Sequence, residues 1–239
     1  MTARGRYNRE GRSEMSIRRT ILIGQLLATL AVLAVVPGNA VKTVSLLALW
    51  LVTFYPVGRR ELVFYLGVCT LFSVMDVVTL RQGIFRFTNA DVLGMPMFEF
   101  FMWGFYLLHV TRFVSGPSPP NRKAAAWGLT AAFCIAFSIL HEPVALLAVS
   151  GGLLVVGLIL FHEPLDFAYV GYTVLVGALV ESTGVWSGQW AYPGAPWGGV
   201  PPWFITLWGG VGLILRRTML PILAPAPRSS LRDASSGAA

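Results

Sequence analysis

The chain has 239 residues, of which 55% are hydrophobic and 12% are charged, and its formal net charge is +7. Its mean hydropathy is +0.67. A soluble domain typically carries about 25% charged residues, so this composition cannot cover a water-exposed surface, and lipid must solvate much of the chain. The basic residues lie at the ends of apolar segments and form no patch with interleaved aromatic residues, which argues against a nucleic-acid partner.

Eight apolar segments follow one another along the chain, each bracketed by charged residues, Pro or Gly. They cover approximately residues 20–37, 41–57, 62–80, 96–115, 124–140, 143–161, 166–185 and 201–221. Lipid offers no hydrogen bonds to the backbone, so each segment must be a helix or a strand of a closed barrel. The segments are continuously apolar and do not alternate as barrel strands do. The sequence therefore predicts an all-α integral membrane protein of about eight transmembrane helices.

Basic residues at the segment ends predict the orientation. With eight spans, most of them fall on one side, which is the cytoplasmic side by the positive-inside rule. We therefore expect a multi-pass protein of the cell membrane with both termini in the cytoplasm. The residues on this side are Arg18, Arg19, Arg59, Arg60, Arg112, Arg122, Lys123, Arg216, Arg217, Arg228 and Arg232.

An internal repeat links the two halves of the chain. A shift of 105 residues places 76–112 on 181–217 without a gap, so that Asp76 meets Glu181 and Gly, Pro and Trp recur at constant spacing. Both copies would contain four spans and insert in the same direction, which predicts two parallel four-helix repeats. The expected organisation is a basic cytoplasmic tail (1–19), a first repeat (20–115), a linker (116–123), a second repeat (124–221) and a disordered tail (222–239).

Three acids are the candidate catalytic residues. Asp76 and Glu181 each lie about six residues inside a helix end, which is roughly 9 Å at 1.5 Å per residue. Carboxyl groups at such depth are expensive and are functional candidates by default, and apolar surroundings favour their uncharged form. Glu99 lies in the first turn of its helix and has no acidic equivalent in the second copy, which has Phe204 there. A structural role for Asp76 and Glu181, capping or bridging helices, is the alternative.

Aromatic residues accompany these acids in both copies. They predict a substrate-binding surface whose π-faces could stabilise a cation, although an aromatic belt at the membrane interface would give the same pattern. The candidates are Phe87, Trp103, Trp186, Trp190, Tyr192, Trp203 and Trp208. His109 is interpreted as a packing histidine. The sequences His141-Glu142-Pro143 and His162-Glu163-Pro164 are interpreted as a coincidence of helix ends.

Motifs of several other chemistries are missing from the sequence. It contains no Gly-rich phosphate loop, no His-Glu-x-x-His helix and no G-x-S-x-G elbow. Three dispersed histidines cannot supply a di-iron cluster, and no paired-aspartate cluster for magnesium diphosphate is present. We therefore expect neither a metal nor a cofactor.

The first copy resembles the duplicated membrane lycopene-cyclase domain of carotenoid biosynthesis. The resemblance rests on Asp76, the stretch Gly83-Ile84-Phe85-Arg86-Phe87, and Gly94-Met95-Pro96-Met97-Phe98-Glu99. It covers about 35 residues in each half, with one acid after Pro96 where the family tends to have two adjacent glutamates. It implies a membrane-embedded fold that acts on an isoprenoid or another lipid.

The function predicted from these features is an isoprenoid-modifying enzyme, an isomerase or lyase that protonates an alkene from a buried carboxyl group. Two like-oriented repeats with buried acids would equally suit a proton-coupled transporter of a small solute or lipid. A structural subunit of a membrane complex is a third interpretation. The expected partners are a membrane lipid or isoprenoid substrate, further copies of the chain or partner membrane enzymes, and no nucleic acid.

Overall fold

The computed structural model describes residues 3–120 and 122–223. Its elements are α1 (Ala3–Val35), α2 (Asn39–Phe54), α3 (Arg59–Arg81), β1 (Arg86–Phe87), α4 (Glu99–Phe113), α5 (Lys123–Ile139), α6 (Pro143–Phe161), α7 (Pro164–Trp186), β2 (Trp190–Ala191), a 3-10 turn (Trp197–Gly199), α8 (Phe204–Ile214), a π-helical turn (Leu215–Met219) and α9 (Leu220–Leu223). The last three form one continuous helical run, so the eight predicted segments correspond to eight helices. Residues 224–239 of the predicted disordered tail lie outside the described residues.

The lengths and apolar composition of several helices are those of membrane-spanning segments. Within the described residues, four helical stretches are long and apolar enough to cross a bilayer: Glu14–Val35, Arg59–Arg81, Pro143–Phe161 and Pro164–Trp186. Helices α2 and α5 are shorter apolar helices. At its N-terminal end α1 begins at Ala3, inside the segment expected to be a basic tail.

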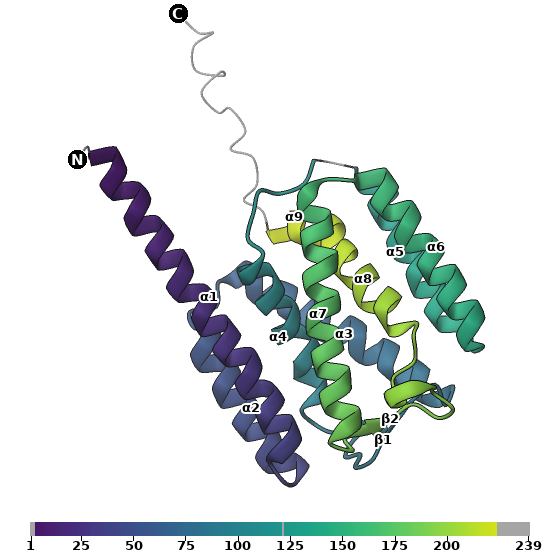
Figure 1. Cartoon of the computed structure of the whole chain (residues 1–239). Coiled ribbons are helices and arrows are strands. Elements are labelled where there is room, and N and C mark those ends of the chain that lie inside the picture. The colour runs from purple at the N-terminus through teal and green to yellow at the C-terminus, as the bar shows by residue number, and fades with distance from the viewer. Residues whose placement is uncertain (1–2, 121, 224–239) are drawn as a thin grey trace, which may run out of the picture.

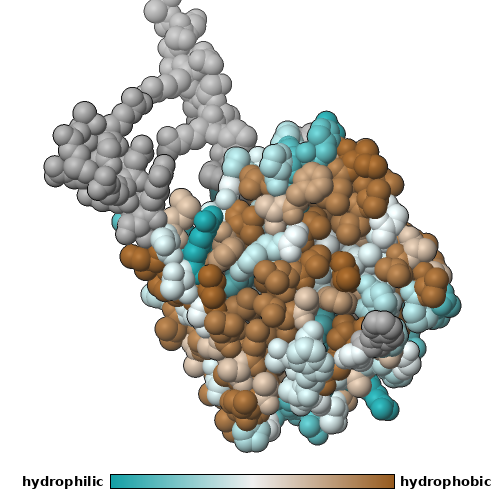
Figure 2. All heavy atoms as spheres, in the orientation of Figure 1, coloured by the Kyte–Doolittle hydropathy of each residue, from teal (hydrophilic) through white to brown (hydrophobic). Residues whose placement is uncertain are grey.

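The shortest main helices lie innermost. Helices α4 and α8 are buried along most of their length and pack against α3 and α7, respectively. Figure 1 shows α1 and α2 on one side of this centre and α5 and α6 on the other. Apolar side chains cover much of the face seen in Figure 2. Exposed apolar residues on the outer helices and short buried helices inside are what a lipid-solvated bundle requires.

The loops after α3 and α7 have the same backbone design. Gly83 (φ +73°) and Gly188 (φ +69°) follow the two helix ends in the left-handed conformation that glycine tolerates. The Gly83 N–H donates to Leu80 O at 3.0 Å, and the Gly188 N–H donates to Val185 O at 3.1 Å. Each is part of a Schellman motif that satisfies the last carbonyls of its helix. Both loops therefore turn back across the bundle.

The two returning loops meet as an antiparallel pair of strands. In this pair Arg86 lies opposite Ala191, and Phe87 lies opposite Trp190. Arg86 and Ala191 are matched positions of the sequence repeat, so the pairing is centred where a two-fold axis relating the copies would pass. Figure 1 shows β1 and β2 at the opposite end of the bundle from α9.

Ion pairs at the other end of the bundle also recur at matched positions. Arg112 binds Glu61 at 2.8 Å, and at the positions shifted by 105 Arg217 binds Asp166. Glu61 and Asp166 each accept the backbone N–H of the residue three positions earlier, at the starts of α3 and α7. The second pair is the more buried, because Asp166 is fully enclosed and Arg216 contributes another guanidinium beside it.

Candidate functional site

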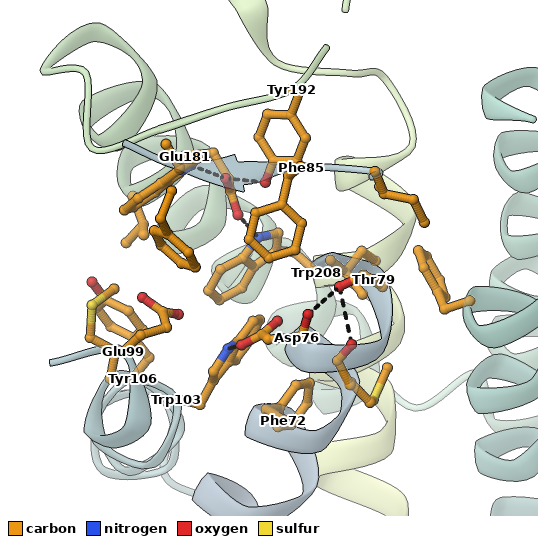
Figure 3. A pocket seen from close by; sticks show the side chains of 18 of the residues that line it. Phe72, Asp76, Thr79, Phe85, Glu99, Trp103, Tyr106, Glu181, Tyr192 and Trp208 are labelled. Carbon is orange, nitrogen blue, oxygen red and sulfur yellow. Dashed lines mark hydrogen bonds between the residues drawn. The ribbon is translucent and has the colours of Figure 1, made fainter. Parts of the chain in front are cut away.

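The three predicted acids converge on one cavity in the centre of the bundle. Asp76 comes from α3, Glu99 from the first turn of α4, and Glu181 from α7. All three line a cavity of about 70 Å³ between the α3–α4 and α7–α8 pairs. Figure 3 shows their carboxyl groups pointing into the same space, with Trp103 and Trp208 close by. The sequence alone left open whether these acids point into one shared space or toward lipid.

A matched pair of indoles holds the two symmetric acids. Trp103 Nε1 donates to Asp76 Oδ2 at 3.0 Å, and Trp208 Nε1 donates to Glu181 Oε1 at 3.2 Å. The two rings stack on each other with centroids 4.8 Å apart. The same acid–indole bond thus recurs at matched positions, and the stack joins the two halves. The structural role considered for Asp76 and Glu181 is part of what they do here.

Glu181 accepts two further hydrogen bonds from the returning loop. Trp190 Nε1 donates to Glu181 Oε2 at 3.0 Å, and the Tyr192 hydroxyl donates to the same oxygen at 2.6 Å. Three donors on one carboxyl group are a stable arrangement for a buried acid. Glu181 therefore anchors β2 to α7 and closes one wall of the cavity.

Glu99 and Tyr106 differ from the other polar residues of the cavity. Within the described part of the chain, Glu99 Oε2 and the Tyr106 hydroxyl are buried without a hydrogen-bond partner. Glu99 is 8% exposed and Tyr106 is 2% exposed. Buried polar atoms are nearly always paired, and an unpaired one costs about 1–3 kcal/mol. This pair is the part of the site most suited to a ligand.

Six of the seven predicted substrate-binding residues line the cavity. They are Phe87, Trp103, Trp190, Tyr192, Trp203 and Trp208. Trp186 does not: its side chain is 78% exposed on the outer face of α7. Tyr106 and Phe72 line the cavity and were not predicted. Tyr106 follows Trp103 by three positions on α4, a spacing that puts both on one helix face and could have indicated it.

A larger hollow adjoins the cavity. It has a volume of about 480 Å³ and lies between the α5–α6 turn and the Pro-rich loop after β2. Ile84, Tyr192 and Trp203 line both spaces. We call this hollow the vestibule. It provides room next to the acids that the cavity itself lacks.

His109 belongs to a separate polar network between α1, α4 and α7. His109 Nδ1 pairs with Gln25 Oε1 at 2.9 Å, and His109 Nε2 pairs with the Tyr172 hydroxyl at 2.7 Å. The Gln25 amide also donates to Thr29 at 2.8 Å. The network fills its own hydrogen-bonding capacity, as expected for a packing histidine, and none of these four residues lines the cavity.

The two His-Glu-Pro sequences cap helices. Glu142 accepts the Val144 and Ala145 N–H groups at the start of α6, and these bonds lower the pKa of its carboxyl group below the usual range. Glu163 begins α7 and also binds Arg216 at 2.7 Å. A Pro at the first helical position explains the third residue of each sequence. The two sequences therefore share a Pro that begins a helix, whereas the Glu142 side chain caps α6 and the Glu163 side chain binds arginines.

The residues present do not form a metal centre. Across 3–120 and 122–223, no group of three or more His, Cys, Asp or Glu is placed to hold a metal ion. None of the described residues that line the cavity is Lys, Arg or His. The cavity therefore combines three acids and aromatic walls with no cation of its own.

Together these features define a helical membrane protein with an acidic and aromatic cavity at its centre. No protein-family model and no curated protein matches the chain. Its fold is similar to that of MvINS, a mycobacterial Insig homologue from Mycobacterium vanbaalenii, with a TM-score of 0.61 and 17% identity over 71% of this chain and 96% of that chain. A second crystal structure, of a cross-linked MvINS trimer, gives a TM-score of 0.62 and 16% identity with the same coverage. The chain thus has an Insig-like fold.

This likeness contradicts the predicted function. The chains that share the fold are copies of an Insig homologue, which is neither an isoprenoid-modifying enzyme nor a transporter. The prediction was wrong because buried acids beside aromatic rings suit a binding site as well as a proton donor. The likeness does not bear on the motif resemblance to the lycopene-cyclase domain, which stays a prediction about sequence.

Proposed function

We propose that this protein is a non-catalytic membrane protein that reversibly binds the polar head of an apolar ligand in the cavity between its two halves. One observation carries the proposal. Glu99 Oε2 and the Tyr106 hydroxyl are buried without partners and belong to an otherwise well-bonded cavity. A ligand that pairs with both would remove the cost of leaving them unpaired.

The cavity is large enough for the head group of a lipid but too small for a whole lipid molecule. Ligand sites for drug-sized molecules usually have volumes of about 300–1,000 Å³. The cavity has about 70 Å³ and the vestibule about 480 Å³. A polar head fits beside the acids, and the rest of an elongated molecule would extend across Ile84, Tyr192 and Trp203 into the vestibule.

Native mass spectrometry of the full chain, purified in a mild detergent, tests this proposal. We expect a lipid adduct at one molecule per chain, released unchanged on denaturation. Val180→Phe should abolish the adduct, because Val180 is buried and lines the cavity. Val74→Phe is the matched control, since Val74 is 58% exposed on α3. Absence of an adduct from the wild type, or its persistence in V180F, would overturn the proposal.

The duplicated architecture is part of the same proposal. We infer that residues 20–115 and 124–221 are tandem parallel repeats joined by 116–123. Support comes from matched contacts: Asp76 with Trp103 and Glu181 with Trp208, and the strand pairing centred on Arg86 and Ala191. If the two repeats are expressed as separate chains, they should assemble into a folded complex. Failure of the two chains to associate would count against the repeat.

The cellular arrangement is proposed on sequence grounds. Basic residues at one end of the bundle favour a cytoplasmic position for both termini in the cell membrane. One matched structure is a cross-linked trimer of MvINS, which supports a homo-oligomer for this chain as well. Reporter fusions at each terminus test the topology. The mass of the intact detergent-solubilised particle tests the oligomer, and a monomer would contradict it.

A further inference from the structure

We propose that the head group bound in the cavity is a primary ammonium, so that the natural ligand is a long-chain amine. This inference rests on the proposed binding function and names its ligand class. It follows from the balance of hydrogen-bond donors and acceptors in the cavity and from its charge.

The donors that line the cavity are almost all in use. The indoles of Trp103, Trp190 and Trp208 donate to Asp76 or Glu181, and so does the Tyr192 hydroxyl. The Thr79 hydroxyl donates to backbone carbonyls of its own helix. Among the described lining residues, the Tyr106 hydroxyl is a buried donor without a partner, and the Trp203 indole N–H is the other lining donor outside these hydrogen bonds. A ligand that needs donors from the protein would find few.

Acceptors are in excess. The Oε2 atom of Glu99 is buried and accepts no hydrogen bond within the described residues. The Tyr106 hydroxyl can accept as well as donate. In Figure 3 Glu99 and Tyr106 lie on the same side of the pocket, with Asp76 nearby. An ammonium group has three N–H donors and no acceptor, which matches this surplus, whereas an alcohol brings a single donor.

Charge and shape favour the same ligand. The cavity has three carboxyl groups and is lined by no basic residue among those described, so it offers an anion no cationic partner. The stacked rings of Trp103 and Trp208 and the ring of Phe72 present π-faces, which attract organic cations. A bare metal ion is not favoured, because within the described residues no acid cluster is placed to hold one.

Titration calorimetry on the full chain in detergent tests this inference with three probes of equal chain length: hexylamine, hexanol and hexyltrimethylammonium. Hexylamine is protonated at neutral pH, as a lysine side chain is. It should bind at least about tenfold more tightly than hexanol, because hydrogen bonds to charged groups are the stronger ones. Hexyltrimethylammonium carries the charge but cannot donate N–H bonds, and it should bind more weakly than hexylamine.

Variants locate the effect at Glu99. Glu99→Gln should weaken hexylamine binding at least about tenfold and change hexanol binding less than about twofold. Glu14→Gln, which removes an exposed acid outside the cavity, should change neither. If Glu99→Gln fails to fold, Tyr106→Phe is the second variant, and it should also weaken hexylamine selectively.

Several results would overturn the ammonium inference. These are equal or tighter binding of hexanol, equal binding of hexyltrimethylammonium, no loss in Glu99→Gln, and no binding of any probe. The binding function is judged separately by the lipid adduct and its loss in Val180→Phe. An adduct that proves to be an alcohol would leave binding intact and remove the amine.

Discussion

Replacing Asp166 by Asn should destabilise the protein far more than the matched change Glu61→Gln. Both acids occupy equivalent positions in their repeats, cap the start of a helix and bind an arginine from the helix that follows the returning loop. They differ in burial: Asp166 is fully enclosed, whereas the Glu61 side chain is 29% exposed. The comparison therefore isolates the effect of burying the charges.

The magnitude follows from the contacts at each site. Arg217 Nε binds Asp166 Oδ1 at 2.7 Å, and Arg216 Nε lies 3.2 Å from the same oxygen. Without the Asp166 charge, two buried guanidiniums would share Glu163, which is partly exposed. Breaking a buried ion pair typically costs about 3–5 kcal/mol, while an exposed pair contributes about 1 kcal/mol or less. D166N should therefore cost about 3 kcal/mol more than E61Q.

Unfolding in a mixed-micelle denaturant titration, followed by tryptophan fluorescence, measures both free energies of unfolding. A difference of about 3 kcal/mol is a factor of about 150 in the folding equilibrium at 1.4 kcal/mol per tenfold. Equal losses in the two variants would refute the reasoning. They would mean that Asp166 stabilises the protein through its helix cap and not through the buried guanidiniums.

Three further predictions concern packing, exposure and pH. Gly177→Ala should destabilise the protein by about 1–3 kcal/mol and perturb tryptophan fluorescence, because a Cβ there would overlap the Trp208 ring; an unchanged melting temperature would contradict it. Trp186→Phe should leave both stability, within about 0.5 kcal/mol, and adduct binding unchanged, because the side chain is exposed away from the cavity. The lowered pKa of Glu142 means that it stabilises the fold above its unfolded-state pKa and loses this effect as pH falls through its folded-state pKa. Glu142→Gln should therefore flatten the acid side of the stability–pH profile, and an identical profile would count against the cap.

The helices and the central acids could be predicted because their signals are local and repeated. Continuous apolar runs specify lipid-solvated helices with little help from tertiary context. Asp76 and Glu181 lie at the same depth in matched helices, so a two-fold relation would bring them to the same level of the bundle. Glu99 could be placed from Pro96, which lies three positions before the start of α4. That all three line one cavity is a result of the packing of α3, α4 and α7, which the sequence left open.

Other residues of the site could not be predicted from the sequence by the same reasoning. Trp186 was selected by residue type, although it follows Glu181 by five positions, which places it about 140° around the helix and away from the cavity. The spacing of Tyr106 from Trp103 could have placed it on the cavity face of α4, but its missing hydrogen-bond partner is a result of packing that sequence does not encode. The absence of basic lining residues also emerges from packing, because Lys42, though buried, binds Gln189 and does not line the cavity.

The prediction of an isoprenoid-modifying enzyme was wrong for a chemical reason. A carboxyl group can donate a proton, bind a cation or fix a loop, and the sequence does not specify which. In the structure Glu181 is bonded by three donors and holds β2 in place, so little of its capacity remains for chemistry. The residue left with unused capacity is Glu99, the acid without a counterpart in the second copy.

An experimental density map of the full chain in lipid nanodiscs, at a resolution that shows side chains, tests the central claim most directly. We expect density for a bound head group in contact with Glu99 and Tyr106, between the two halves of the molecule. A map in which Glu99 turns outward to lipid, or in which protein side chains fill the space beside it, would contradict the account.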